Sequence, residues 1–174
     1  MATHSVFPHY DLTFFTMTIV GWQELFTRIQ YQEIIIKNLI FCMDNKGLQI
    51  FSYVVMPNHI HVLASSNKNK LGDIVRDFKS YSARQLLLEV SENEQLSRRS
   101  RLQNSFSYYA GKNNSNNQIW TNQNAPKICD RPGMASQFQQ YIEMNPVKAG
   151  FVEEPHYWRL SSANENSPIP VLSL

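Results

Sequence analysis

Residues 51–65 restrict the fold more than any other part of the chain, because they read as strand, tight turn and strand. Residues 51–56 are mostly β-branched or aromatic, and Pro57-Asn58 is a turn signal. After the turn, His59 and His61 alternate with an isoleucine and a valine. Side chains on a strand alternate between faces, so both imidazoles should leave one face while the aliphatic residues enter the core.

Two imidazoles side by side on a sheet could both coordinate one divalent metal ion. The alternative is a pair of histidines on a solvated or partly packed strand face. A pattern of His-x-His on a strand does not decide between these two readings by itself.

The rest of the chain predicts an α+β protein. We expect strands over 10–20, 48–56 and 59–65, a short fourth strand beginning at 119–120, and helices over 27–45, 71–90 and from about 130 to Pro146. The order strand-helix-strand-strand-helix-strand is a ferredoxin-like (RRM-like) split βαβ arrangement, a central antiparallel sheet with helices on one face and a C-terminal helix that carries Tyr141. The histidine strand should be central, and its open face should be the active surface.

The helix before Pro146 offers further polar groups. Tyr141 and Asn145 are four residues apart, which places them on one helix face. The amide oxygen of Asn145 suits Mg²⁺ or Mn²⁺, although Asn145 could instead cap the helix before the proline. Tyr141 could be a nucleophile or an ordinary tyrosine of an amphipathic helix, because its spacing alone does not separate the two.

Two motifs carry a family resemblance. One is Val-Met-Pro-Asn-His-Ile-His-Val-Leu at residues 55–63, and the other is Tyr-Ile-Glu-Met-Asn-Pro-Val-Lys-Ala-Gly-Phe-Val at residues 141–152. Both resemble signatures of the single-tyrosine HUH transposases, in particular the REP-associated tyrosine transposases. The resemblance spans residues 10–163, and one departure lies at Ala125, where that branch often has a histidine before the proline.

The resemblance implies a complete site and its chemistry. Tyr141 would be the nucleophile, and His59, His61 and Asn145 would hold Mg²⁺ or Mn²⁺. The protein would bind a hairpin in single-stranded DNA, cut beside it through a 5′-phosphotyrosine and rejoin strands, working as a monomer. Two alternatives stay open: a domesticated hairpin-binding protein with little transposition, and a metal-dependent nucleotide hydrolase of the histidine-triad type. The last needs a third histidine where Leu63 stands.

The distribution of charge is more informative than its sum, which is only +2. Residues 68–112 contain nine basic and five acidic residues. We expect the basic residues to contact DNA, although they could form an ordinary solvated surface. The nine are Lys68, Lys70, Arg76, Lys79, Arg84, Arg98, Arg99, Arg101 and Lys112.

Length and composition predict one globular domain over residues 1–163. Within it, the polar segment 91–117 should be an extended or partly helical, mobile insertion, and residues 164–174 should form a disordered tail. The sequence contains no membrane-spanning stretch and no signal peptide, so we expect a cytoplasmic protein without membrane contact.

Overall fold

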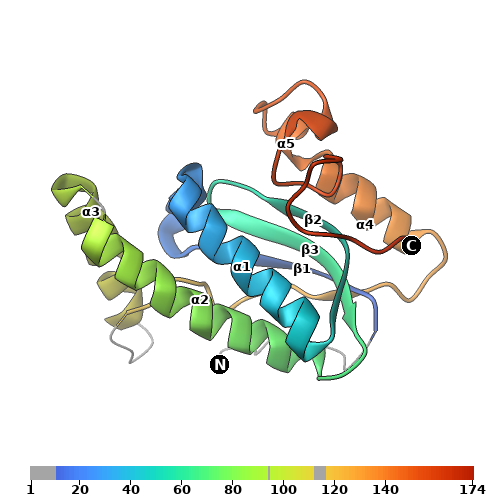
Figure 1. The fold of residues 1–174 in the computed structure, drawn as a ribbon, viewed down its shortest axis with the longest axis horizontal. Coiled ribbons are helices and arrows are strands. Elements are labelled where there is room, and N and C mark those ends of the chain that lie inside the picture. Colours follow the sequence, from blue (N-terminus) through green and yellow to red (C-terminus); the bar gives the residue numbers. More distant parts are fainter. Residues whose placement is uncertain (1–10, 94, 112–116) are drawn as a thin grey trace.

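The structure, a computed structural model, describes residues 11–93, 95–111 and 117–174. At its centre is a four-stranded antiparallel sheet in the order β2-β3-β1-β4 (Figure 1). The strands are β1 (Thr13–Thr18), β2 (Leu48–Val55), β3 (His59–Ser66) and β4 (Lys127–Ile128). This order confirms the predicted ferredoxin-like arrangement, with the histidine strand β3 inside the sheet.

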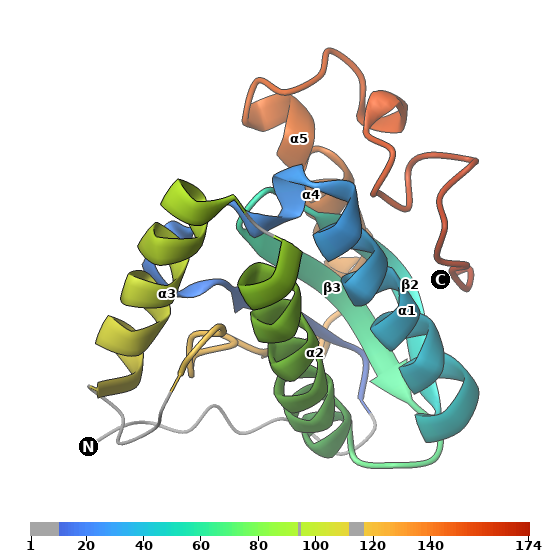
Figure 2. The ribbon, with the colours of Figure 1, turned by 60° about the vertical axis from the view of Figure 1, so that its left-hand side comes forward.

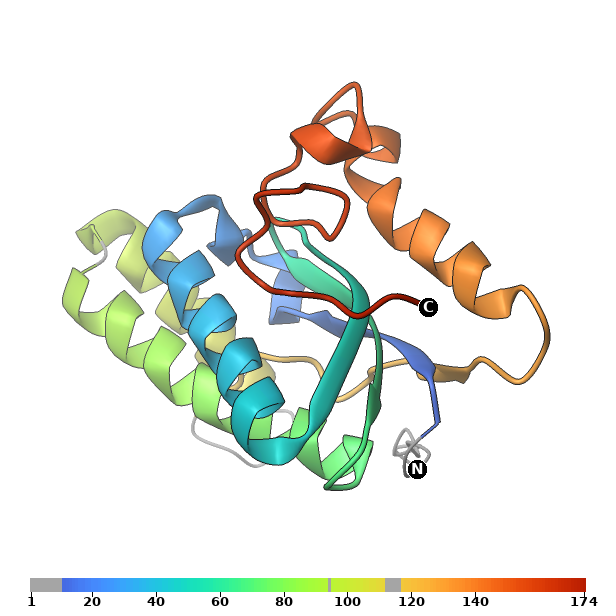
Figure 3. The same ribbon diagram turned by 45° about the vertical axis from the view of Figure 1, so that its right-hand side comes forward.

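Helices cover both faces of the sheet. The long helices α1 (Ile29–Lys46) and α2 (Leu71–Asn93) lie side by side on one face (Figure 2). Helix α4 (Met134–Glu143) crosses the opposite face, over β2 and β3 (Figure 3). A further helix is α3 (Leu96–Gly111), and the short helical segments are η1 (Val20–Trp22), η2 (Leu25–Thr27), α5 (Asn145–Lys148) and η3 (Pro155–Tyr157).

The two faces of β3 belong to two apolar clusters of very different size. Ile60 and Val62 are fully buried in the main core beneath α1 and α2. Leu63 lies on the other face, in a small cluster with Phe14 of β1 and Ile142 of α4. The alternation predicted from the sequence is therefore present, and it leaves the two histidines on the face that α4 covers only in part.

The predicted position of the fourth strand was wrong. Trp120 makes only an isolated bridge to Ile19, whereas β4 pairs Lys127 and Ile128 with the start of β1. Residues 119–128 follow the whole β1 edge, and the backbone hydrogen bond from Thr16 N to Asn124 O lies midway along it. The pairing is broken because this stretch contains a proline, which has no N–H to donate.

The segment 91–117, expected to be an extended or partly helical insertion, contains the end of α2 and the four-turn helix α3. Leu102, Phe106 and Ala110 are buried, and the first two belong to the main core. Their spacing of four residues forms one helix face, a signal that the surrounding serines, asparagines and arginines obscured. Whether the segment moves in solution stays a prediction.

The chain after α5 covers the outer edge of β2 instead of leaving the domain. Val55 N donates to Leu160 O, and Leu172 N donates to Ile50 O. The side chain of Ile169 is 1% exposed. Residues 164–174 therefore lie against the sheet where the sequence predicted a disordered tail, because a buried isoleucine between two prolines anchors a segment of otherwise polar composition.

No helix in the described ranges is long and apolar enough to cross a membrane.

Candidate active site

The two histidines of β3 form a pair on the sheet face that carries α4. Because they are two residues apart on a strand, their rings are neighbours, with centroids 4.6 Å apart in an edge-to-face arrangement. His61 is 6% exposed, and His59 at the end of the strand is partly buried. Their position beside the nearly buried ring of Phe14 makes this a recessed site rather than a solvated strand face.

A hydrogen bond orients each imidazole. Nδ1 of His59 is 2.7 Å from Oδ1 of Asn58, and Nδ1 of His61 is 2.8 Å from the hydroxyl of Thr16 on β1. Since an amide oxygen only accepts, Nδ1 of His59 carries the proton and its Nε2 lone pair is free. The Thr16 hydroxyl can accept from His61 in the same way. Sequence reasoning treated Asn58 as a turn residue and gave Thr16 no role.

Burial keeps both imidazoles neutral. It lowers the pKa of His59, and it lowers the pKa of His61 to about 3, with the charge of neighbouring His59 as a smaller cause. At neutral pH both rings therefore hold the unprotonated form that binds a metal. In the described part of the chain, no third His, Cys, Asp or Glu joins this pair. A third protein ligand would have to be a neutral group.

Helix α4 brings Tyr141 to the histidines. The Tyr141 ring centroid is 5.3 Å from that of His61 and 5.7 Å from that of Phe14, and the side chain is 40% exposed. Two apolar contacts hold the helix in this orientation. Ile142 is fully buried under it, and Phe138 stacks on Phe14 at 4.7 Å. The phenol therefore reaches solvent while its ring is fixed against the histidine pair.

Asn145 follows α4 by two residues and is partly buried. The residue that caps both α4 and α5 is Met144, with helical φ and ψ, so Asn145 stays about one turn beyond Tyr141. Capping by Asn145, the alternative considered from the sequence, finds no support in this arrangement. Among the described residues its side-chain amide has no hydrogen-bond partner, which leaves its oxygen available as a ligand.

This donor set fits a divalent cation. Two neutral imidazoles, and an amide oxygen about one helical turn beyond Tyr141, are ligand types that Mn²⁺ and Mg²⁺ accept. His59, His61 and Asn145 are therefore the residues that would hold the ion. Leu63, at the position where a hydrolase of the histidine-triad type needs a third histidine, is instead fully buried in the small cluster.

The predicted DNA-contacting residues are not gathered at this site. Those in the described ranges lie on α2, on the loop before it and on α3, whereas the histidines lie beside Tyr141 of α4. Figures 1 and 3 show α2 and α4 on opposite sides of the sheet. Lys112 lies outside the described residues. Lys68, Lys70, Arg84 and Arg101 are exposed, and for these the expected contact with DNA stays a prediction.

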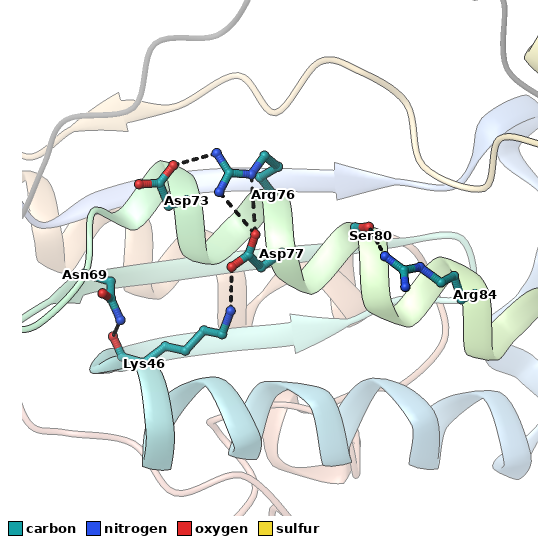
Figure 4. Close-up of polar contacts among 7 residues, drawn as sticks. All are labelled: Lys46, Asn69, Asp73, Arg76, Asp77, Ser80 and Arg84. Carbon is teal, nitrogen blue, oxygen red and sulfur yellow. Dashed lines mark hydrogen bonds and ion pairs between the residues drawn. The ribbon is translucent and has the colours of Figure 1, made fainter.

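Several of these cations have partners inside the protein. Lys79 Nζ donates to Thr121 O at 2.6 Å and to Oδ1 of Asn124 at 2.8 Å, so it holds the β1-edge segment onto α2. Arg98 donates to Glu24 O at 2.9 Å. Arg76 pairs with Asp73 and Asp77, as Figure 4 shows.

A cavity of about 510 Å³ lies between α1 and α2, with Lys46, Asp77 and Arg84 among the residues around it. Figure 4 shows the Lys46–Asp77 ion pair and the Arg84–Ser80 hydrogen bond in this region. The cavity belongs to the helical side of the sheet and is separated from the histidine pair by the main core.

Sequence comparison identifies the family to which this chain belongs. Residues 23–122 match the family described as "Transposase IS200 like". The chain belongs to this family of transposases, which are DNA-processing enzymes. No curated protein matches the chain.

One solved structure shows the same fold. The structure of a REP-associated tyrosine transposase bound to a REP hairpin is similar over 93% of this chain and 82% of its own, with 18% identity and a TM-score of 0.58. A second structure, of a proposed transposase from Deinococcus radiodurans R1, covers 82% of this chain and 96% of its own, with 18% identity and a TM-score of 0.41.

Proposed function

We propose that this chain cleaves and rejoins single-stranded DNA beside a hairpin, with Tyr141 as the nucleophile. The observation that carries the proposal is the position of the Tyr141 ring, 5.3 Å from His61 and within one cluster with His59. Membership of the IS200-like family supports DNA as the substrate. The fold similarity to a transposase that binds a REP hairpin supports the hairpin.

The residues divide the work of the reaction. The Tyr141 hydroxyl attacks the phosphorus of the scissile phosphodiester, and the bond to the 3′ oxygen breaks. The 3′ oxygen takes up a proton from water, which leaves a 5′-phosphotyrosine and a free 3′ hydroxyl. The proton of the Tyr141 hydroxyl passes to water, since Tyr141 is 40% exposed. A divalent ion on His59, His61 and Asn145 would polarise the phosphate. We expect the protein to act as a monomer.

Lys148 adds a positive charge beside the nucleophile. Its Nζ lies 5.5 Å from the centroid of the Tyr141 ring. A phosphate that approaches the phenol must therefore approach this ammonium group, which favours binding of the anionic backbone in the reactive position.

The test compares Tyr141→Phe with Tyr157→Phe, an exposed tyrosine of η3. The labelled hairpin is taken from a palindromic sequence in the DNA beside the gene. Wild type and Tyr157→Phe should form a covalent adduct with it in Mn²⁺ that survives denaturing electrophoresis, and Tyr141→Phe should form none. Hairpin binding should persist in Tyr141→Phe, and its melting temperature should change by only about 1–2 °C, because the Tyr141 hydroxyl has no hydrogen-bond partner among the described residues.

Peptide mapping decides between the alternatives. DNA attached to Tyr108 or Tyr109 of α3 would keep the mechanism and refute the nucleophile. Cleavage without any adduct would indicate a hydrolase that uses water. Binding without cleavage by the wild type would indicate a protein that recognises hairpins only.

Binding should also weaken steeply as salt rises, because phosphate contacts release counterions. Replacing the exposed Lys68, Lys70 and Arg101 by glutamine should reduce the slope of log affinity against log salt by about one for each phosphate contact that is lost. An unchanged slope would assign these residues to ordinary solvated surface.

A further inference from the structure

Trp22, just after β1, is a large apolar side chain that is 67% exposed beside the candidate active site. Its ring lies edge-on to that of His59, with centroids 6.2 Å apart. Trp22, His59, His61 and Tyr141 therefore form a row of rings, with successive centroid distances of 6.2, 4.6 and 5.3 Å. Trp22 stands at one end of the row, and the proposed nucleophile stands at the other.

The backbone at Trp22 is held in a conformation that side chains disfavour. Trp22 has a φ of 54°, in the left-handed region that residues other than glycine rarely adopt. Such residues persist where the surrounding structure overdetermines them, and they concentrate at functional sites. The Trp22 side chain contributes little to the stability of the fold, because its ring is mostly exposed to water.

The neighbours of Trp22 fix its position from two sides. Ile19 N donates to Asn58 O, which ties the segment to the turn that carries His59. On the other side, Gly21 (φ 61°) packs against α3, where an added Cβ would come within 2.9 Å of the Tyr109 ring. Figure 2 shows α3 beside the segment that follows β1. The backbone that carries the indole is thus held from both sides, and the indole is exposed next to the histidine pair.

We propose that Trp22 is a stacking platform for a nucleobase of the single strand that flanks the scissile phosphate. A rigid, exposed indole binds any base through its π face, so the platform tolerates different sequences. With a phosphate between Tyr141 and the histidines, a neighbouring nucleotide of the same strand lies along the row of rings towards Trp22. This inference rests on the proposed function and adds to it a contact that positions the strand.

The first experiment measures binding without metal, so that cleavage plays no part. The two probes are the fluorescein-labelled hairpin of the cleavage test with a single-stranded extension, and the same hairpin with blunt ends. Trp22→Ala should weaken binding of the extended hairpin about 10-fold and leave the blunt hairpin unaffected. Trp22→Phe should retain most of the affinity. Phe41→Ala removes a ring that is 53% exposed on α1, far from the site, and should change neither affinity.

Trp22→Gly separates stacking from folding. Glycine accepts a φ of 54° without strain, so this variant should melt at the wild-type temperature or above while losing the same affinity as Trp22→Ala. A loss of affinity that follows a loss of folding across the variants would instead give Trp22 a structural role and overturn the inference.

An abasic scan identifies the stacked base. Nucleotides of the extension are replaced one at a time by abasic residues. At one position the loss for the wild type should be about as large as for Trp22→Ala, and combining the two changes should add almost nothing. Equal affinities of wild type and Trp22→Ala for every extended probe would refute the platform while leaving the proposed function standing. A wild type that binds none of the probes would contradict both.

Discussion

Lys79 offers a quantitative test of how the β1 edge is held, because it is a cation largely removed from water. Burial lowers its pKa from 10.5 to about 8. In the unfolded chain the ammonium group should titrate near its ordinary value. Between about pH 8 and pH 10.5 the unfolded state therefore binds more protons than the folded state, and stability must rise with pH across this window.

The size of the effect follows from the two pKa values. Linkage gives a contribution to the free energy of unfolding that is about 2 kcal/mol larger at pH 9.5 than at pH 7. Other groups titrate over the same range. Burial raises the pKa of Cys42 to about 11, for example, which lowers stability with rising pH above about pH 9. The comparison must therefore be made between variants in identical buffers.

Lys79→Met removes the titrating group with little change in volume. Urea unfolding at pH 7 and pH 9.5 should show that wild type gains about 2 kcal/mol relative to Lys79→Met on going to the higher pH. Lys37→Met is the matched control, because Lys37 is exposed on α1 and pairs with the exposed Glu33 one turn away. It should follow the wild type at both pH values. An equal wild-type advantage at both pH values would mean that the bonds to Thr121 and Asn124 offset the burial of the charge.

Two further changes test the tail and the orientation of the histidines. Ile169→Ala should lower the free energy of unfolding by about 2–5 kcal/mol, whereas Val171→Ala, which truncates an exposed side chain of the same segment, should cost less than about 0.5 kcal/mol in a urea titration. Thr16→Val removes the hydroxyl at Nδ1 of His61 and should weaken Mn²⁺ binding about 10-fold by calorimetry, with Thr18→Val on the same face of β1 as the control. Equal Mn²⁺ affinities for the two threonine variants would remove Thr16 from the site.

The features that could be predicted from the sequence were those that depend on the regular spacing of residues along a single strand or helix. The alternation of residues 59–65 placed both imidazoles on one face, and the spacing of Tyr141 from Asn145 placed them about one turn apart. Both patterns depend only on local geometry, so no knowledge of the fold was needed. The resemblance then supplied their roles, which spacing alone had left open.

The remaining parts of the site depend on contacts between distant residues. The Thr16 hydroxyl meets His61 across 45 positions of sequence, and Trp22 reaches His59 only because the end of β1 and the β2–β3 turn bond to each other. The sequence around Thr16 or Trp22 contains no pattern that predicts these contacts. Lys79 was expected to contact DNA because it lies in a basic stretch of the sequence. In the structure its ammonium group donates to Thr121 and Asn124, and these distant partners could not be predicted either.

The edges of the sheet are covered by chain that is synthesised later than the strands it covers. Residues 119–128 protect β1, and residues 160–172 protect β2. During translation β1, β2 and β3 can pair as soon as β3 has left the ribosome, but the unpaired N–H and C=O groups of β2 find no partner until residues 160–172 emerge. In that interval the nascent protein carries an open strand edge, the feature by which chains pair with one another and aggregate.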